Sequence, residues 1–322
     1  MDELKKNGVP PSGRPVVFGE VLFDDFEDGP TVIGGAAFNL AWNLESIGLG
    51  PLLVSRVGCD ELGDRALEIM GSYGMDVSGI QADEELPTGT VSVKVSEGQP
   101  EFTINDSQAY DAIDADEARG AVGAIEVSLL YHGSLALRSK CSRGALDTLA
   151  VLIPESIFVD VNLRRPWWEK TSVLGDLSRA RWAKLNEEEL FELSDVPDSS
   201  PEGLLAAASD FRRQLDLELL LLTRGADGAA MLRSAGPPIV LPAAAAGKVA
   251  DTVGAGDAIT AVAMLGLARG WDGATIIERA VEFAASICGL EGATTDQRRH
   301  YDDFLERWEG SGREASRLGG GR

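Results

Sequence analysis

Short apolar runs alternate along the chain with longer segments in which apolar residues recur every three or four positions. The short runs have the length of β-strands, and the longer segments have the period of helices with one buried face. Strands that alternate with helices predict a mostly parallel sheet with helices on both faces. The predicted strands are 15–18, 52–57, 127–132, 156–161, 181–185, 218–223 and 229–232, and the predicted helices are 36–46, 62–71, 143–152, 187–193, 203–214, 257–268 and 275–288.

The segment 88–104 has a different pattern. Its sequence, TGTVSVKVSEGQPEFTI, alternates apolar and polar residues on both sides of Ser96-Glu97-Gly98. A period of two around a turn sequence predicts an antiparallel hairpin with one solvated face. Because this hairpin interrupts a parallel α/β pattern, we expect it to form a small β lid, with lid segments at about 21–32 and 87–106.

The two ends of the chain lack such patterning. Residues 1–14 are polar and contain Pro10, Pro11 and Gly13, and residues 310–322 are rich in Gly and Arg. Neither segment has enough apolar surface to order itself, so both are predicted to be flexible tails. No long linker divides residues 15–309, which we interpret as one α/β domain.

The composition narrows the classes of function. The 322 residues include 29 Lys and Arg against 52 Asp and Glu, a formal net charge of −23. Phosphate backbones and anionic membranes repel such a chain, which excludes nucleic-acid or membrane binding through a basic face. Cys59, Cys141 and Cys288 lack the spacing of a disulfide framework or a zinc site. Because there is no apolar leader and no run of 18 apolar residues, we expect a cytoplasmic protein.

The most informative segment is Asp251-Thr-Val-Gly-Ala-Gly-Asp257, which an uninterrupted apolar helix follows. Small residues at 254–256 let the backbone approach a ligand, and the helix N-terminus offers N–H groups and a positive dipole end to an anion. Asp257 fits an anion site if it faces an acceptor hydroxyl as a general base while the N–H groups hold a transferring phosphoryl group. The alternative is a glycine-rich turn in which Asp257 caps the helix.

Polar residues also follow other predicted strands, at the end where open α/β sheets bind ligands. One group lies at alternate positions, so its three side chains are expected to project the same way. In the second group, two glycines precede a predicted helix, and an asparagine side chain lies on the first turn of that helix. These residues are Asp160, Asn162 and Arg164 in the first group, and Gly34, Gly35 and Asn39 in the second.

Two more segments suit phosphate chemistry. Asn186 and Glu189 lie three residues apart, on one face of a helical turn, and their oxygen atoms suit Mg²⁺ bound through water. The alternative for Asn186 is a helix cap. The turn from Thr223 through Gly225 to Gly228 ends a Leu-rich strand, and the alternative there is a simple β-turn. The chain has no GxxxxGK[ST] motif, which excludes a P-loop enzyme, and no GxGxxG after the first strand, which disfavours a dinucleotide-binding protein.

Seven of these segments occur in an order that resembles the ribokinase-like, or PfkB-type, carbohydrate kinases, over roughly residues 15–305. The seven are GEVLFD (19–24), GGAAFN (34–39), VGCDELG (57–63), DVNLRRPWW (160–168), KLNEEE (184–189), LTRGADG (222–228) and DTVGAGD (251–257). The first of them, together with HGSLALRS (132–139) and the D-x-N-x-R-x-x-W pattern, looks most like the fructokinase branch.

The resemblance implies a three-layer sandwich, with a mainly parallel central sheet flanked by helices and a small β lid. It implies that Asp257 is the catalytic base and that Gly254, Ala255 and Gly256 form the anion hole. It further implies sugar or substrate contacts by Asp24, Gly34, Gly35, Asn39, Asn162 and Arg164, and nucleotide contacts by Asn186, Thr223, Gly225, Gly228, Gly254 and Gly256. Asn186 and Glu189 would organise Mg²⁺ through water, and carbonyls near Asp251 would bind a monovalent cation such as K⁺.

We therefore expect an ATP-dependent, Mg²⁺-requiring kinase of a furanose-type sugar, with fructose as the first candidate. Alternatives are a kinase of 2-keto-3-deoxygluconate, ribose or a nucleoside, a sugar-binding regulator without activity, or an oxidoreductase with a dinucleotide-binding fold. The acceptor is not fixed by the motifs, because lid and loop geometry select it. The half-apolar hairpin predicts a homodimer in which it pairs with the lid of a second subunit.

Overall fold

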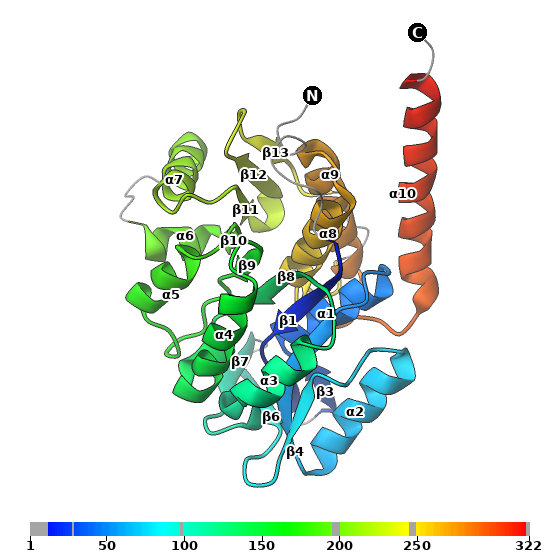
Figure 1. Ribbon diagram of the computed structural model, residues 1–322. Coiled ribbons are helices and arrows are strands. Elements are labelled where there is room, and N and C mark those ends of the chain that lie inside the picture. Colours follow the sequence, from blue (N-terminus) through cyan, green and yellow to red (C-terminus); the bar gives the residue numbers. More distant parts are fainter. Residues whose placement is uncertain (1–11, 28, 97–98, 195–199, 245–248, 320–322) are drawn as a thin grey trace.

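A computed structural model describes residues 12–27, 29–96, 99–194, 200–244 and 249–319 (Figure 1). Its described strands form a nine-stranded main sheet and a separate four-stranded sheet. Neighbouring strands of the main sheet are parallel, except that β12 runs antiparallel to β11 and to β13. In spatial order, the main sheet consists of β13 (Ile239–Leu241), β12 (Ala229–Arg233), β11 (Leu219–Thr223), β10 (Trp182–Asn186), β9 (Ile157–Asp160), β8 (Val127–His132), β1 (Arg14–Phe18), β4 (Leu52–Gly58) and β5 (Ile80–Asp83).

Helices cover both faces of this sheet because successive strand residues point to opposite sides. Val17 packs in the apolar core on one face, whereas Val16 and Phe18 pack in the core on the other. The first core lies beneath α1 (Ala36–Ser46), α2 (Glu61–Tyr73), α8 (Ala255–Arg269), α9 (Gly273–Ile287) and α10 (Arg298–Gly319). The second lies beneath α3 (Ala115–Val122), α4 (Lys140–Leu152), α5 (Lys170–Leu177), α6 (Glu187–Leu193) and α7 (Pro201–Gln214). The result is the predicted three-layer α/β arrangement.

Each strand and helix predicted from the patterns is present, with ends that differ by a few residues. The difference that bears on function is that α8 begins at Ala255 and not at Asp257. The pattern did not predict β5, β13, α3 and α5, which are short, nor the polar helix α10. Short or polar elements carry too few apolar residues to establish a period, and their packing neighbours stabilise them instead.

The four-stranded sheet is the predicted lid. Its order is β3 (Thr31–Gly34), β2 (Leu22–Phe26), β6 (Gly89–Ser96) and β7 (Gln99–Ile104). The hairpin of β6 and β7 is antiparallel as predicted, and its turn residues Glu97 and Gly98 lie outside the described residues. A parallel pairing of β2 with β6, with Leu22 opposite Gly89, joins the two lid segments into one sheet.

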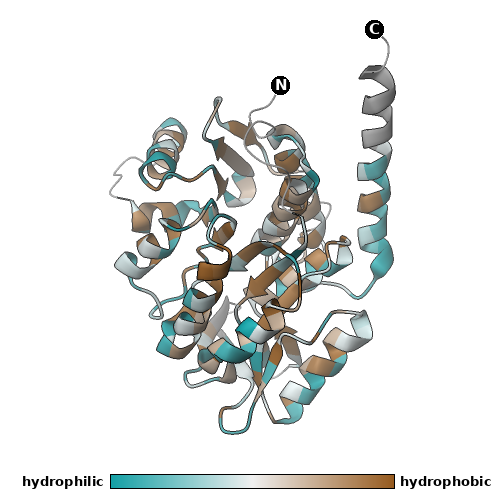
Figure 2. Cartoon of the chain, in the orientation of Figure 1, coloured by the Kyte–Doolittle hydropathy of each residue, from teal (hydrophilic) through white to brown (hydrophobic). Residues whose placement is uncertain are grey.

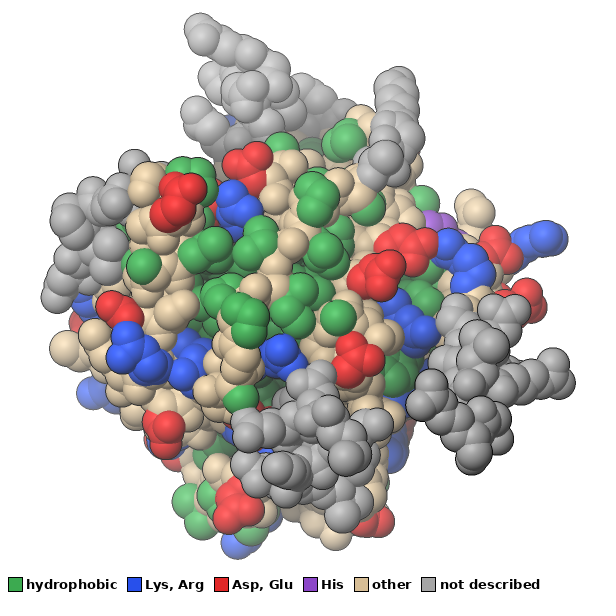
Figure 3. Space-filling view, turned by 90° about the horizontal axis from the view of Figure 1, so that it is seen from above, with side chains coloured by type: hydrophobic (Ala, Val, Ile, Leu, Met, Phe, Trp, Pro, Cys, Tyr) green, Lys and Arg blue, Asp and Glu red, His purple; other side chains and the backbone are tan. Residues whose placement is uncertain are grey.

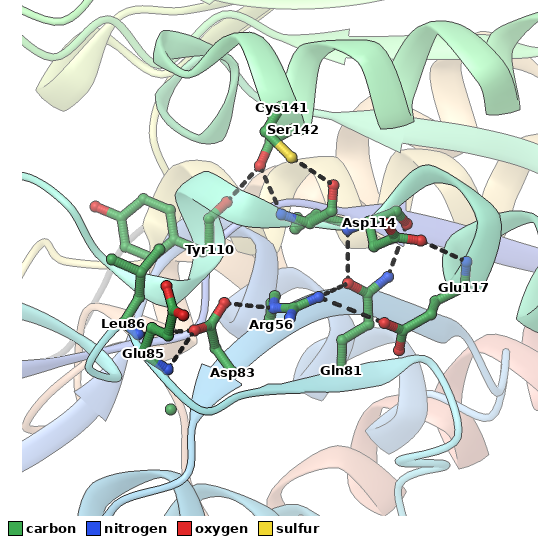
Figure 4. A network of polar contacts seen from close by, with 12 residues as sticks. Arg56, Gln81, Asp83, Glu85, Leu86, Tyr110, Asp114, Glu117, Cys141 and Ser142 are labelled. Atoms are coloured by element: carbon green, nitrogen blue, oxygen red, sulfur yellow. Dashed lines mark hydrogen bonds and ion pairs between the residues drawn. The ribbon is translucent and has the colours of Figure 1, made fainter.

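A polar network holds the chain where it leaves the main sheet for the lid (Figure 4). Arg56 Nε on β4 donates to Asp83 Oδ2 at 2.7 Å, and Asp83 Oδ1 accepts the backbone N–H groups of Glu85 and Leu86. Thr88, two residues after Leu86, donates hydrogen bonds through its backbone N–H and its hydroxyl group to the two carboxylate oxygens of Asp60. The base of the lid is therefore fixed to the main sheet and to the N-terminus of α2.

Helix α10 extends as far as Gly319, into the residues 310–322 for which a flexible tail stays a prediction. The residues after 310 include Arg, Glu, Ala and Leu, which favour a helix once the preceding turns are formed. Those turns are held by Tyr301, Phe304 and Trp308, whose rings lie against Phe283 of α9. At the other end, Arg14 belongs to β1, and residues 1–11 lie outside the described residues.

Apolar residues are concentrated inside the molecule, along the main strands and around α8 (Figure 2). On the face seen in Figure 3, acidic and basic side chains surround a gathering of hydrophobic ones, so the net negative charge does not form a uniform layer there. Among the described helices, none is both long enough and apolar enough to cross a lipid bilayer.

Candidate functional site

The predicted site residues gather where the parallel strands of the main sheet end. Parallel strands place their carboxyl ends at one edge of a sheet. Asp160 at the end of β9 is the register partner of Lys184 on β10, and Asn186 at the end of β10 is the partner of Thr223 on β11. Segments that are far apart in the sequence therefore meet at one edge.

The N-terminus of α8 faces this edge. Its N-cap is Gly254, in the left-handed region with φ 78°, and the Gly254 carbonyl accepts the Ala258 N–H at 2.8 Å. A Cβ atom at position 254 would lie 2.4 Å from Ala293 Cβ, so only glycine fits. Because a glycine N-cap has no side chain to accept hydrogen bonds, no capping side chain occupies the first-turn N–H groups, although the Ala255 N–H makes a long bond of 3.4 Å to the Thr252 carbonyl oxygen.

Asp257 lies in the first turn of α8 and does not cap it, so the helix-cap alternative is wrong. Its Oδ2 atom accepts a hydrogen bond of 3.0 Å from Asn39 Nδ2 on α1. Although the side chain keeps partial contact with solvent, burial raises the pKa of Asp257 to about 7, with a further contribution from Asp160. Asn39 and Lys184 oppose the rise. A carboxyl group with a pKa near neutral pH is suited to general-base catalysis.

Asn39 reaches Asp257 because α1 begins directly after the two glycines. Gly35 is the N-cap with φ 105°, and a Cβ atom there would lie 2.8 Å from the Glu20 carbonyl oxygen. Glu20 is buried, and its Oε1 atom accepts the Ala36 N–H at 2.9 Å, at the start of α1. Glu20 was not predicted as a site residue. The signal for it was a carboxylate two residues after an apolar strand, followed again by apolar residues.

Two of the other predicted sugar-side residues lie together in the lid sheet. Gly34 adjoins Asp24, since a Cβ atom at position 34 would lie 3.3 Å from Asp24 Oδ2. Burial raises the pKa of Asp24 and of Glu20, and the positive charge of the exposed Arg164 acts against both rises. Asp24, Gly34, Glu20 and Arg164 therefore share one electrostatic environment.

The expectation that Asp160, Asn162 and Arg164 project together from one strand needs correction. Strand β9 ends at Asp160, and Asn162 has a φ of 40°, which breaks the extended conformation on which the alternation depends. Asp160 is fully buried, whereas Arg164 is exposed and near Asp24.

Asn186 and Glu189 form a reciprocal cap at the start of α6. Asn186 Oδ1 accepts the Glu189 N–H and Glu189 Oε2 accepts the Asn186 N–H, each at 2.8 Å. Glu189 Oε1 also accepts the Leu163 N–H at 2.9 Å, which ties down the loop that carries Asn162 and Arg164. The capping alternative is thus confirmed. Within the described ranges, no three His, Cys, Asp or Glu side chains come together in a way that could hold a metal ion.

The turn after β11 has the geometry of a compact loop. The Gly228 N–H donates to the Gly225 carbonyl at 3.2 Å, and the Arg224 N–H donates to the Gly228 carbonyl at 2.8 Å. Gly228 has a φ of 89°, and a Cβ atom there would lie 2.2 Å from the Leu241 carbonyl oxygen. The loop with Thr223, Gly225 and Gly228 is therefore packed against the end of β13.

Asp251 shapes the segment that leads into α8. Its Oδ1 atom accepts the Val253 N–H at 3.0 Å. The N–H groups of Ala250 and Asp251 both donate to the Cys288 carbonyl oxygen, at 2.8 and 3.2 Å. The monovalent cation expected near Asp251 stays a prediction.

Comparison with known proteins decides the family. The model of the pfkB family carbohydrate kinases matches residues 26–299. The chain belongs to this family. An uncharacterized sugar kinase, PH1459 of Pyrococcus horikoshii, is 27% identical over 246 residues, which are 76% of this chain and 75% of that protein. The crystal structure of PH1459 in complex with ATP has a TM-score of 0.73 at 24% identity and covers 87% of this chain and 93% of that one.

Other relatives of this carbohydrate kinase carry different names. The bifunctional protein HldE of Azorhizobium caulinodans is 28% identical over 246 residues, and the match spans 74% of this chain and 49% of HldE. The chain thus spans about half the length of that relative. A fructokinase of Xylella fastidiosa with bound ATP has a TM-score of 0.76 at 19% identity over 92% of this chain and 99% of its own. The likeness confirms the ribokinase-like fold, and the fructokinase branch is not singled out.

Proposed function

We propose that this carbohydrate kinase transfers the γ-phosphoryl group of ATP to a primary hydroxyl group of a furanose-type sugar, with fructose as the first candidate. One observation carries the proposal: Asp257, bound to Asn39, lies in the first turn of a helix whose N-terminus has a glycine cap and no competing side chain. A base and an anion site thereby adjoin each other. The presence of ATP in crystal structures of PH1459 and of the Xylella fructokinase supports ATP as the donor.

Each part of the site has a role in this reaction. Asp257 would take the proton from the sugar hydroxyl as its oxygen attacks the γ-phosphorus, and Asn39 holds the carboxylate in place by donating to Oδ2. The N–H groups of 254–256 would hold the phosphoryl oxygens, where one such donor typically contributes roughly 3 kcal/mol to the transition state. Asp24 and Arg164 would contact sugar hydroxyl groups, and the turn from Thr223 to Gly228 would border the nucleotide.

The residues fit Mg²⁺ bound through water, because the Glu189 oxygens already accept backbone N–H groups and direct coordination would compete with these bonds. Mg²⁺ would neutralise charge on the ATP phosphates. Asn186 and Glu189 would then orient its water molecules. A nucleoside acceptor remains the main alternative, with the exposed Phe102 of β7 available to stack on a base. Neither the homodimer nor the cytoplasmic location goes beyond a prediction.

The function is tested by measuring ADP release with fructose, ribose, 2-keto-3-deoxygluconate and nucleosides, each with and without Mg²⁺. We expect one ketose or furanose to exceed the other acceptors by at least about ten-fold in kcat/KM, since loss of a few hydroxyl contacts has this effect or more. Activity should vanish when EDTA removes Mg²⁺. If no acceptor releases ADP although ATP and a sugar bind, the chain is a sugar-binding regulator.

The pKa of Asp257 predicts the pH dependence of this activity. A base must be deprotonated in the free enzyme, and the pKa of Asp257 is about 7. We therefore expect kcat/KM to rise about ten-fold per pH unit below pH 7 and to level off above it. The profile is measured between pH 5.5 and 9 with the coupling enzymes in excess. A profile that is flat down to pH 5.5 would contradict the assignment of Asp257 as the base.

A further inference from the structure

A buried charged cluster lies beneath the N-terminus of α8 and has no place in the proposed mechanism so far. It consists of Asp160 on β9, Lys184 on β10 and Thr260 on α8, whose exposed fractions are 0%, 6% and 0%. Phe158 and Trp182 belong to the core on the α8 side of the sheet. Two residues further along the same strands, Asp160 and Lys184 therefore lie on this same face, where the apolar core ends.

Asp160 holds the ammonium group of Lys184 in place. Lys184 Nζ donates to Asp160 Oδ1 at 3.0 Å, and the Thr260 hydroxyl lies 3.0 Å from Asp160 Oδ2. The same hydroxyl is 3.1 Å from the carbonyl oxygen of Gly256. Both carboxylate oxygens are therefore engaged, and the cluster is bonded directly to the first turn of α8. An ammonium group has three donors, and one of them is used in its hydrogen bond to Asp160.

The ammonium group also packs against that turn. A Cβ atom at position 256 would lie 2.9 Å from Lys184 Nζ, so any side chain there would push the ammonium group away from its present place. Gly256 directly precedes Asp257, the proposed base. The second glycine of the GAGD sequence thus has a function besides its backbone approach to a ligand, because it admits a buried cation next to the anion site.

This cation stands among several acids. Lys184 lies in the field of Asp160, Glu189 and Asp257, and their attraction raises the pKa of the lysine although burial alone would lower it. A bound nucleoside triphosphate would add further negative charge. The groups that face Asp257 from the elements around it are Glu20 after β1, Asn39 on α1, Tyr131 on β8, Asp160 on β9 and Lys184 on β10. Within this set of described residues, Lys184 is the one positive charge.

We propose that Lys184 is a positioning residue of the phosphoryl-transfer site, held by Asp160 and Thr260, whose fixed positive charge favours the carboxylate form of Asp257 beside the phosphates. The proposal rests on the proposed function, since it assigns Lys184 a task in that reaction. Lys184 acts through its electrostatic field and through packing against Gly256, and the proposal involves no covalent step.

Three variants test the proposal: Lys184→Met, Asp160→Asn and the double variant. Removing the cation should raise the pKa of Asp257, because Lys184 is one of the groups that oppose its rise, and a nearby opposite charge commonly lowers a carboxyl pKa by about one unit or more. The acid limb of the kcat/KM profile then moves to higher pH, and kcat/KM at pH 7 falls at least about five-fold. Asp160→Asn should move the limb to lower pH, since Asp160 acts on Asp257 with the opposite sign.

The double variant controls for a loss of folding in Lys184→Met. Lys184→Met alone leaves Asp160 buried without its partner, and such a change commonly destabilises a protein by about 3–5 kcal/mol. Removing both charges avoids this, and the two opposing effects should return the limb close to its wild-type position. Should Lys184→Met fail to fold, Asp160→Asn and the double variant still decide the matter. If Lys184 and Asp160 had purely structural roles, Lys184→Met and Asp160→Asn would be less stable than wild type, but their acid limbs would not move in opposite directions.

Arg143→Met is the control for loss of a cation beside a buried acid, because Arg143 pairs with the buried Asp176 on the opposite face of the sheet, although Asp176 also keeps an ion pair with Arg179. It should lower stability and leave the limb in place. A ¹³C NMR titration of the Asp257 carboxyl, assigned with Asp257→Asn, gives the pKa without any acceptor. If wild type releases no ADP, the proposed function fails while this titration still decides the role of Lys184. Unchanged Asp257 titration in both Lys184→Met and Asp160→Asn overturns the proposal.

Discussion

Asp257→Asn is expected to lower kcat by roughly 10²–10⁴-fold, the usual contribution of a general base, with dissociation constants for ATP and sugar that change little. Asparagine has nearly the shape of aspartate, so it still fits beside Asn39 on α1. What it loses is the ability to take the proton from the attacking hydroxyl. The variant is examined by steady-state kinetics and by calorimetric titration of both ligands.

The same variant should be more stable than wild type at pH 8. The pKa of Asp257 is about 7 in the folded protein and 3.8 as the ordinary value, so the folded state favours the protonated form. The stability that this preference contributes is fully present below pH 3.8 and is lost as the pH rises through about 7. Asparagine stays neutral, so the Tm difference should be large at pH 8 and vanish near pH 4.

Asp272→Asn serves as the control, because Asp272 caps α9 through Thr275, and an asparagine caps nearly as well. It should change neither kcat nor the pH dependence of the Tm by much. Near-wild-type turnover of Asp257→Asn would refute the assignment of the base. A loss of ATP binding without the stability gain would instead indicate a role for Asp257 in holding the nucleotide.

Gly254→Ala is expected to lower kcat/KM by about 10²-fold or more, comparable to loss of an oxyanion-hole donor. Two effects add here. The φ of 78° disfavours any residue with a Cβ atom, and that atom would lie 2.4 Å from Ala293 Cβ and 2.6 Å from Ala293 Cα. Because backbone atoms are involved, the first turn of α8 must move, and with it the N–H groups that would hold the phosphoryl oxygens.

Gly48→Ala separates these two effects. Gly48 has the same φ of 78°, and a Cβ atom there would meet nothing within 4 Å. It should therefore lose only the roughly 1 kcal/mol that alanine costs in the left-handed region, with full activity. Kinetics and thermal unfolding of both variants make the comparison. Equal activity in the two would mean that the first turn of α8 does not bind the transferring group.

The fold was largely predictable because its strands are apolar and its helices have a clear period. Residues 127–132 were predicted as a strand and form β8 with the same limits. Helix α10 was missed because its register depends on the rings of Phe304 and Trp308 packing on Phe283, and no local pattern reports a contact with α9.

The candidate site was predictable in its parts, and its assembly was not. Motif spacing placed Asn39 and Asp257 each at a helix start, and the hydrogen bond between them joins positions 218 residues apart. Lys184 opens the KLNEEE segment (184–189) but was not predicted as a site residue, since a lysine near a strand end is ordinarily exposed. Only the register pairing of Lys184 with Asp160, beneath a helix that has glycine at 256, shows that it is buried.

The long separation between the two sides of the site has a consequence for synthesis of the protein on the ribosome. Glu20, Asn39 and the first lid strand emerge early, whereas Asp257 follows 218 residues after Asn39. At 5–20 residues per second, Asp257 is added roughly 10–40 s later. Gly254 also packs against Ala293, and Trp42 Nε1 donates to the Thr295 carbonyl oxygen. A nascent chain shorter than about 295 residues therefore holds the described strands, the last of which ends at Leu241, but lacks the contacts that Ala293 and Thr295 make with the two sides of the site.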